Sequence, residues 1–99
     1  MNTYAILRRS AWRSPEELEE AAGRSTKAGE DMGEDEIRWI RSYVLEEGAG
    51  LGTVCIYEAE SEDAIRGHAS DADLPVTEIV KVADTVIVRP DPEPAAASN

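Results

Sequence analysis

Short apolar runs alternate with helical segments along the chain. The runs cover residues 2–8, 37–45, 53–57 and 79–88, and the second is especially rich in β-branched and aromatic residues, as strands commonly are. The last run is expected to bend or bulge near Asp84. Between these runs lie two segments with the start signals and spacing of helices. The pattern therefore predicts the order β-α-β-β-α-β.

A serine marks the start of each predicted helix. Ser14 precedes a proline and two glutamates, so its hydroxyl can cap the free backbone amides while the acids favour the positive end of the helix dipole. We expect this helix to pack through small side chains and to stop near Gly29. Ser61 begins the second helix in the same way, and His68 lies on its apolar stripe.

The connecting segments separate these elements. Five acids among residues 30–36 predict a solvated loop, and the glycines within residues 46–50 predict the turn of a hairpin. Prolines after residue 89 interrupt regular structure. We therefore expect one folded domain over residues 1–89 and a disordered Pro/Ala-rich tail over residues 90–99.

The order of the elements predicts an α+β fold. Its standard solution is the ferredoxin-like βαββαβ sandwich, in which a four-stranded antiparallel sheet carries both helices on one face. The chain has 99 residues, which suffice for one such domain but not for two independent cores.

Both faces of the predicted sheet carry large apolar side chains. Strict alternation along the strand over 37–45 puts Trp39 and Tyr43 on one face, which Tyr57 of the next strand joins. Two short helices cover only one face, and monomers seldom leave an apolar patch of such size open. We therefore predict a homodimer that buries these aromatic residues through the sheet or its edge. The alternative is that the C-terminal segment folds back over that face.

Charge and composition exclude several classes of function. The formal net charge is −11, so nucleic acids and anionic membranes are repelled whereas cations are attracted. No apolar run approaches the roughly 20 residues of a membrane span. The single cysteine, Cys55, excludes an internal disulfide, and the N-terminus lacks the order of charges of a signal peptide. We expect a cytoplasmic protein.

Few side chains are candidates for chemistry. His68, the only histidine, is either a packed core residue or a metal ligand, and as a ligand it needs Cys55, carboxylates or the same histidine of a second copy. Cys55 is either a small buried residue or a soft thiolate ligand. Tyr43 and Tyr57 are either packing residues or proton donors in a cleft.

Four segments of the sequence resemble a family of small actinobacterial proteins, described as a domain of unknown function, that includes a nickel-binding, nickel-responsive member. The segments are Trp39-Ile40-Arg41-Ser42-Tyr43-Val44, Cys55-Ile56-Tyr57-Glu58-Ala59, Glu62-Asp63-Ala64-Ile65-Arg66-Gly67-His68-Ala69 and Leu74-Pro75-Val76. The resemblance implies a dimeric ferredoxin-like protein, with His68 as the helix histidine of the family and Cys55 as its strand cysteine. It implies possible nickel binding as a property of the family.

Three hypotheses for the function follow. The first is a non-enzymatic protein that binds nickel or another divalent cation through His68 with Cys55 or carboxylates. The second is a small cofactor-free enzyme of the dimeric ferredoxin-like type, which requires a pocket that reaches His68. The third is a structural or regulatory dimer without a small ligand, in which His68 and Cys55 are simply packed.

Overall fold

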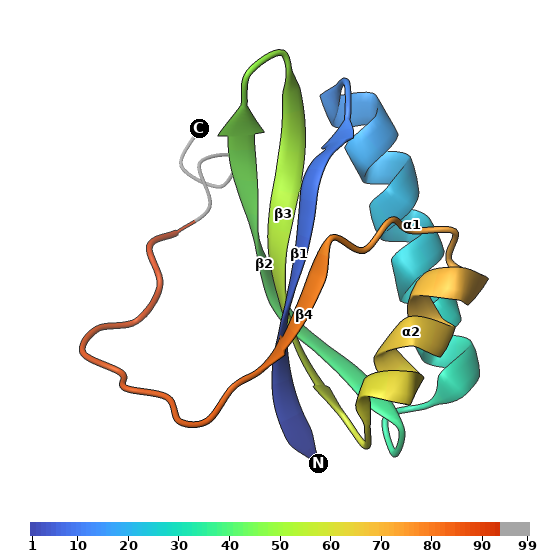
Figure 1. Cartoon of the computed structure of the whole chain (residues 1–99), viewed down its shortest axis with the longest axis vertical. Helices are drawn as coiled ribbons and strands as arrows, with labels where there is room; N and C mark the ends of the chain where they lie inside the picture. The colour runs from blue at the N-terminus through green and yellow to red at the C-terminus, as the bar shows by residue number, and fades with distance from the viewer. Residues whose placement is uncertain (94–99) are drawn as a thin grey trace.

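All six predicted elements form, in the predicted order. The computed structural model describes residues 1–93, and its elements are β1 (Asn2–Trp12), α1 (Pro15–Met32), β2 (Ile37–Glu47), β3 (Gly50–Ala59), α2 (Glu62–Asp71) and β4 (Glu78–Lys81). The strands form one sheet in the order β2-β3-β1-β4, and each strand is antiparallel to its neighbours. Both helices lie on one side of this sheet (Figure 1). The predicted ferredoxin-like α+β fold is confirmed.

Helix α1 is longer than the sequence pattern predicted. Ser14 caps its start as expected, but the helix continues through Gly29 to Met32, and its C-cap is Gly33, whose positive φ of 93° suits a glycine. A Cβ on Gly29 would lie 3.9 Å from Nε2 of His68, so this glycine lies where α1 passes close to α2. The first residues of the predicted acidic loop therefore belong to the last turn of α1.

Strand β4 is shorter than predicted and ends at Lys81. Its pairing with β1 runs from Leu7 towards the start of the chain, and the last bond joins the amide of Val82 to the carbonyl of Thr3. Strand β1 begins at Asn2, so β4 has no partner beyond this point. The predicted strand over 79–88 was therefore wrong from residue 82 onwards. Residues 94–99 of the predicted tail lie outside the described part of the chain.

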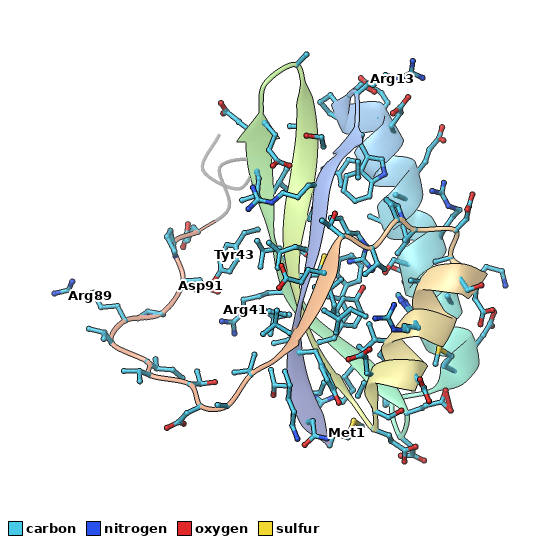
Figure 2. The ribbon with its side chains drawn as sticks, viewed as in Figure 1. Met1, Arg13, Arg41, Tyr43, Arg89 and Asp91 are labelled. Atoms are coloured by element: carbon cyan, nitrogen blue, oxygen red, sulfur yellow. The ribbon has the colours of Figure 1, made fainter. Side chains whose placement is uncertain are left out.

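A bulge in β2 changes which side chains share a face. The register with β3 shifts between Trp39 and Arg41, so that Ile40 is an extra residue. Trp39 faces the helices and stacks on Tyr57, with ring centroids 6.0 Å apart. Tyr43 points away from the helices (Figure 2). The prediction that Trp39 and Tyr43 share a face was therefore wrong, because strict alternation does not continue past the bulge.

The two faces of the sheet differ in their cover. The face that packs on the helices contains the core, formed by Tyr4, Ile6, Ile37, Cys55, Tyr57, Ala59 and Ile65. We call the opposite side the outer face; its apolar residues are half-buried or exposed, and they are Ala5, Leu7, Tyr43, Leu45, Val54, Ile56 and Val80. The outer face therefore has an apolar centre, the ion pairs Arg38–Glu58 and Arg9–Glu47 beside it, and no helical cover.

The C-terminal segment contacts the outer face through Asp91. Asp91 accepts a hydrogen bond of 2.8 Å from the Tyr43 hydroxyl and pairs with Nε of Arg41 at 3.2 Å (Figure 2). Between these contacts and β4 the chain loops away from the sheet, and its apolar stretch Val86–Val88 is more than 80% exposed (Figure 1). Neither of the two described helices is long and apolar enough to cross a membrane.

Candidate functional site

A groove follows the helix-facing side of the sheet, between α1 and strands β2 and β3. Trp39, Tyr57 and Ser25 line both halves of this groove and divide it into two pockets. The first, here called the apolar pocket, has a volume of about 190 Å³. The second, called the polar pocket, has a volume of about 440 Å³ and includes His68 and residues from the last turn of α1.

The walls of the apolar pocket come from every layer of the fold. Five large apolar side chains belong to its lining, namely Trp12, Leu18, Trp39, Val44 and Leu74. Strand β3 contributes Thr53, Cys55 and Tyr57 to its floor. Because Trp12 and Trp39 are the only two tryptophans of the chain, its whole tryptophan fluorescence reports on this pocket.

Arg8 is the one charged residue that lines the apolar pocket within the described part of the chain. It follows Tyr4 and Ile6 at two-residue spacing on the buried face of β1, and its side chain is only 2% exposed. Its Nε and Nη2 atoms are buried and have no hydrogen-bond partner among residues 1–93. Sequence reasoning missed Arg8, because Arg8 and Arg9 were taken together as the end of the first strand. The alternation with Tyr4 and Ile6 was the available signal.

Tyr57, Ser25 and His68 form a buried polar cluster between the two pockets. The hydroxyls of Ser25 and Tyr57 lie 2.8 Å apart, and the Tyr57 and His68 rings are tilted against each other with centroids 5.3 Å apart. Burial raises the pKa of Tyr57 to about 12, against the smaller opposing effect of the hydrogen bond from Ser25. The phenol therefore stays protonated at neutral pH.

His68 is held as a neutral, packed side chain. Its Nε2 lies 2.9 Å from the backbone carbonyl of Ser25, and because a carbonyl only accepts, we assign the ring proton to Nε2. Burial lowers the pKa of His68, the Ser25 carbonyl partly opposes this, and the positive charge of Arg8 lowers the pKa further. Nε2 thus carries no free lone pair towards the Ser25 hydroxyl, which lies 3.5 Å away.

Cys55 and His68 line different pockets. Cys55 is buried on β3 in the floor of the apolar pocket, where its thiol lies 3.4 Å from the Thr53 hydroxyl. His68 reaches only the polar pocket. Among residues 1–93, no three side chains of His, Cys, Asp or Glu gather closely enough to hold a metal ion. The two predicted ligands therefore do not fit a nickel centre within one copy of the chain.

The three aromatic residues predicted to form a pocket or an interface are divided between the two faces. Trp39 and Tyr57 line both pockets of the groove. Tyr43 lines neither pocket and lies on the outer face, where its hydroxyl bonds to Asp91.

The fold and the groove define a class: a small ferredoxin-like α+β protein with ligand-sized pockets between helix and sheet. The family model described as "Nickel responsive protein SCO4226-like" matches residues 4–82, so the chain belongs to this family. The predicted resemblance to a family with a nickel-responsive member is thereby confirmed.

A solved structure agrees with the fold. The crystal structure of SCO4226 from Streptomyces coelicolor A3(2) matches with a TM-score of 0.65 and 17% identity, and the match covers 85% of this chain and 99% of that chain. At this identity the likeness shows the fold alone. No curated protein matches the chain.

Proposed function

We propose that the protein is a non-enzymatic binding protein that holds a small organic molecule in the apolar pocket. The observation that carries this proposal is the pocket itself, whose volume is about 190 Å³ and whose walls are apolar. A dry apolar cavity of about 150 Å³ is large enough for a benzene molecule. The pocket therefore suits a ligand of the size of one aromatic ring with a small substituent.

The polar groups of the groove favour binding over catalysis. The polar pocket does reach His68, as the hypothesis of a cofactor-free enzyme required. However, general acid–base catalysis needs a group that exchanges its proton near the working pH. Tyr57 keeps its proton, because its pKa is raised to about 12, and the Nε2 proton of His68 is directed at a backbone carbonyl. These groups hold the walls of the groove in place rather than move protons.

The proposal includes a homodimer joined through the outer face. Seven apolar side chains on that face have no helix over them, and a second copy would bury them in a two-fold interface. The groove lies on the opposite side of the sheet, so pairing of this kind leaves both pockets open. We place this dimer in the cytoplasm, because the free, buried thiol of Cys55 needs no oxidising compartment.

Titration with a neutral aromatic probe tests the binding function. We expect benzyl alcohol to change the tryptophan fluorescence saturably, because both tryptophans line the pocket. The variant Ala22→Leu, which fills the pocket from α1, should weaken binding about tenfold or more. Glu19→Leu, an exposed position on the same helix, is the matched control and should bind as the wild type does. The absence of a saturable change in the wild type would refute the proposed function.

Direct nickel binding is the second candidate function. It is favoured by the description of the family and by the net charge of −11, which concentrates cations around the protein. Calorimetric titration of nickel chloride into protein without a His tag measures it. We expect His68→Ala and Cys55→Ser to keep the wild-type affinity, because both side chains are buried and already packed. Loss of nickel uptake in either variant would make that residue a ligand after all, and no uptake in the wild type would remove this candidate.

A further inference from the structure

The guanidinium of Arg8 is buried without the partners that such a group requires. It lies on the helix-facing side of β1 with two nitrogen atoms unpaired among residues 1–93. Buried charges in proteins are normally paired and hydrogen-bonded, because removing a charge from water is costly. The ion pairs within the described part of the chain all involve other basic residues, and none includes Arg8. Residues 1–93 therefore provide no ion-pair partner for this charge.

The charge lies in a pocket that has room for its missing partner. Arg8 lines the apolar pocket, whose described lining contains no carboxylate and no second cation. Its Nε and Nη2 atoms are covered, so a ligand reaches them only when the guanidinium turns towards the cavity. A guanidinium presents its N–H groups in a planar fork that matches the two oxygens of a carboxylate. Because the lining contains a single positive charge, a ligand with a single negative charge would neutralise it.

From this placement we propose that the apolar pocket binds a small monocarboxylic acid as its carboxylate, with Arg8 pairing to the carboxylate and the apolar walls enclosing a ring-sized hydrocarbon body. The inference rests on the proposed binding function and adds the chemical class of the ligand. An inorganic anion such as chloride would satisfy Arg8, but it would leave the tryptophan and leucine walls of a pocket of about 190 Å³ without contact. An apolar body fills that space.

Paired titrations with benzoate and benzyl alcohol test the inference. Both probes carry one ring, and only benzoate carries a charge. In the wild type we expect benzoate to bind at least about tenfold more tightly than benzyl alcohol, since hydrogen bonds to charged groups have this effect. In Arg8→Met, benzoate should lose at least about tenfold more affinity than benzyl alcohol does, because only benzoate loses a charged partner.

Two further variants make the comparison specific. Arg9→Met removes the same charge from the next residue, whose side chain is exposed and pairs with Glu47, and it should bind benzoate as the wild type does. Arg8→Lys keeps the charge but loses the fork, so its benzoate affinity should fall between those of the wild type and Arg8→Met. If Arg8→Met does not fold, the loss of benzoate affinity in Arg8→Lys tests the inference instead.

The outcomes separate the inference from the function on which it rests. If benzyl alcohol binds but benzoate gains nothing from Arg8, the carboxylate inference is overturned and the binding function stands. If sodium chloride displaces benzoate at constant ionic strength and binds as tightly as benzoate does, the site is one for inorganic anions and the inference is again overturned. If neither aromatic probe binds, the proposed function falls and the inference falls with it.

Discussion

The variant Val54→Glu is expected to be a monomer at micromolar concentrations at which the wild type is a dimer. Val54 lies on the central strand β3, and on the outer face its neighbours across the sheet are Leu7 and Tyr43. A carboxylate here would be buried in the proposed interface between Leu7 and Tyr43, neither of which carries a positive charge. An uncompensated buried charge costs about 3 to 5 kcal/mol, which weakens a dimer at least a hundredfold.

Light scattering coupled to size-exclusion chromatography measures this effect. Thr26→Glu is the matched control, since it adds the same charge at an exposed position of α1, on the other side of the sheet. We expect this control to remain a dimer. A monomeric wild type, or a dimer that survives Val54→Glu, would show that the outer face is not the interface. The C-terminal segment, whose Asp91 accepts a hydrogen bond from Tyr43, would then be the better candidate to cover this face.

Replacing Arg8 by methionine is expected to stabilise the ligand-free protein. Methionine fills a similar volume without charge, so the variant removes two buried, unpaired N–H groups and keeps most of the packing. Relief of such groups contributes about 2 kcal/mol. For a domain of this size, that corresponds to a rise in Tm of roughly 10 °C.

Thermal unfolding at one fixed protein concentration, in buffer without carboxylates, measures this change. Arg9→Met should shift the free energy of unfolding by less than about 1 kcal/mol, because the Arg9 side of its ion pair with Glu47 is largely exposed. Benzoate should raise the Tm of the wild type and leave that of Arg8→Met nearly unchanged. A less stable Arg8→Met would mean that the guanidinium is satisfied within the protein, for example by ordered water.

The sequence was enough to predict the order of the elements and the fold. It was not enough to predict which side chains of a strand share a face of the sheet, or where the last strand ends. Ser14 and Ser61 marked both helix starts correctly, because capping is a local effect that neighbouring residues determine. The bulge at Ile40 was invisible, since an inserted residue has the same propensity as its neighbours and is revealed only by the register of the partner strand. The early end of β4 was equally hidden, because it depends on where β1 begins.

The candidate site was predicted in part. Trp39, Cys55 and Tyr57 were singled out from their sequence, and the structure brings them together in the lining of one pocket. His68 was expected to be either a packed core residue or a metal ligand, and the structure shows a buried ring bonded to a backbone carbonyl. Arg8 was missed because a pair of arginines at a strand end usually lies in solvent. Only the tertiary structure shows that the first of the two is buried.

The sheet is a single layer, so the wall of the apolar pocket and the outer face share the same strands. A change in one of these surfaces therefore affects the other. Val44 belongs to the wall of the apolar pocket, and the adjacent Tyr43 belongs to the outer face. Thr53 and Val54 are arranged in the same way on the next strand. A substitution that reshapes the cavity shifts backbone shared with the other side. In the proposed dimer, a change in the proposed ligand preference would therefore also change self-association, and relatives that diverge in one property should diverge in the other.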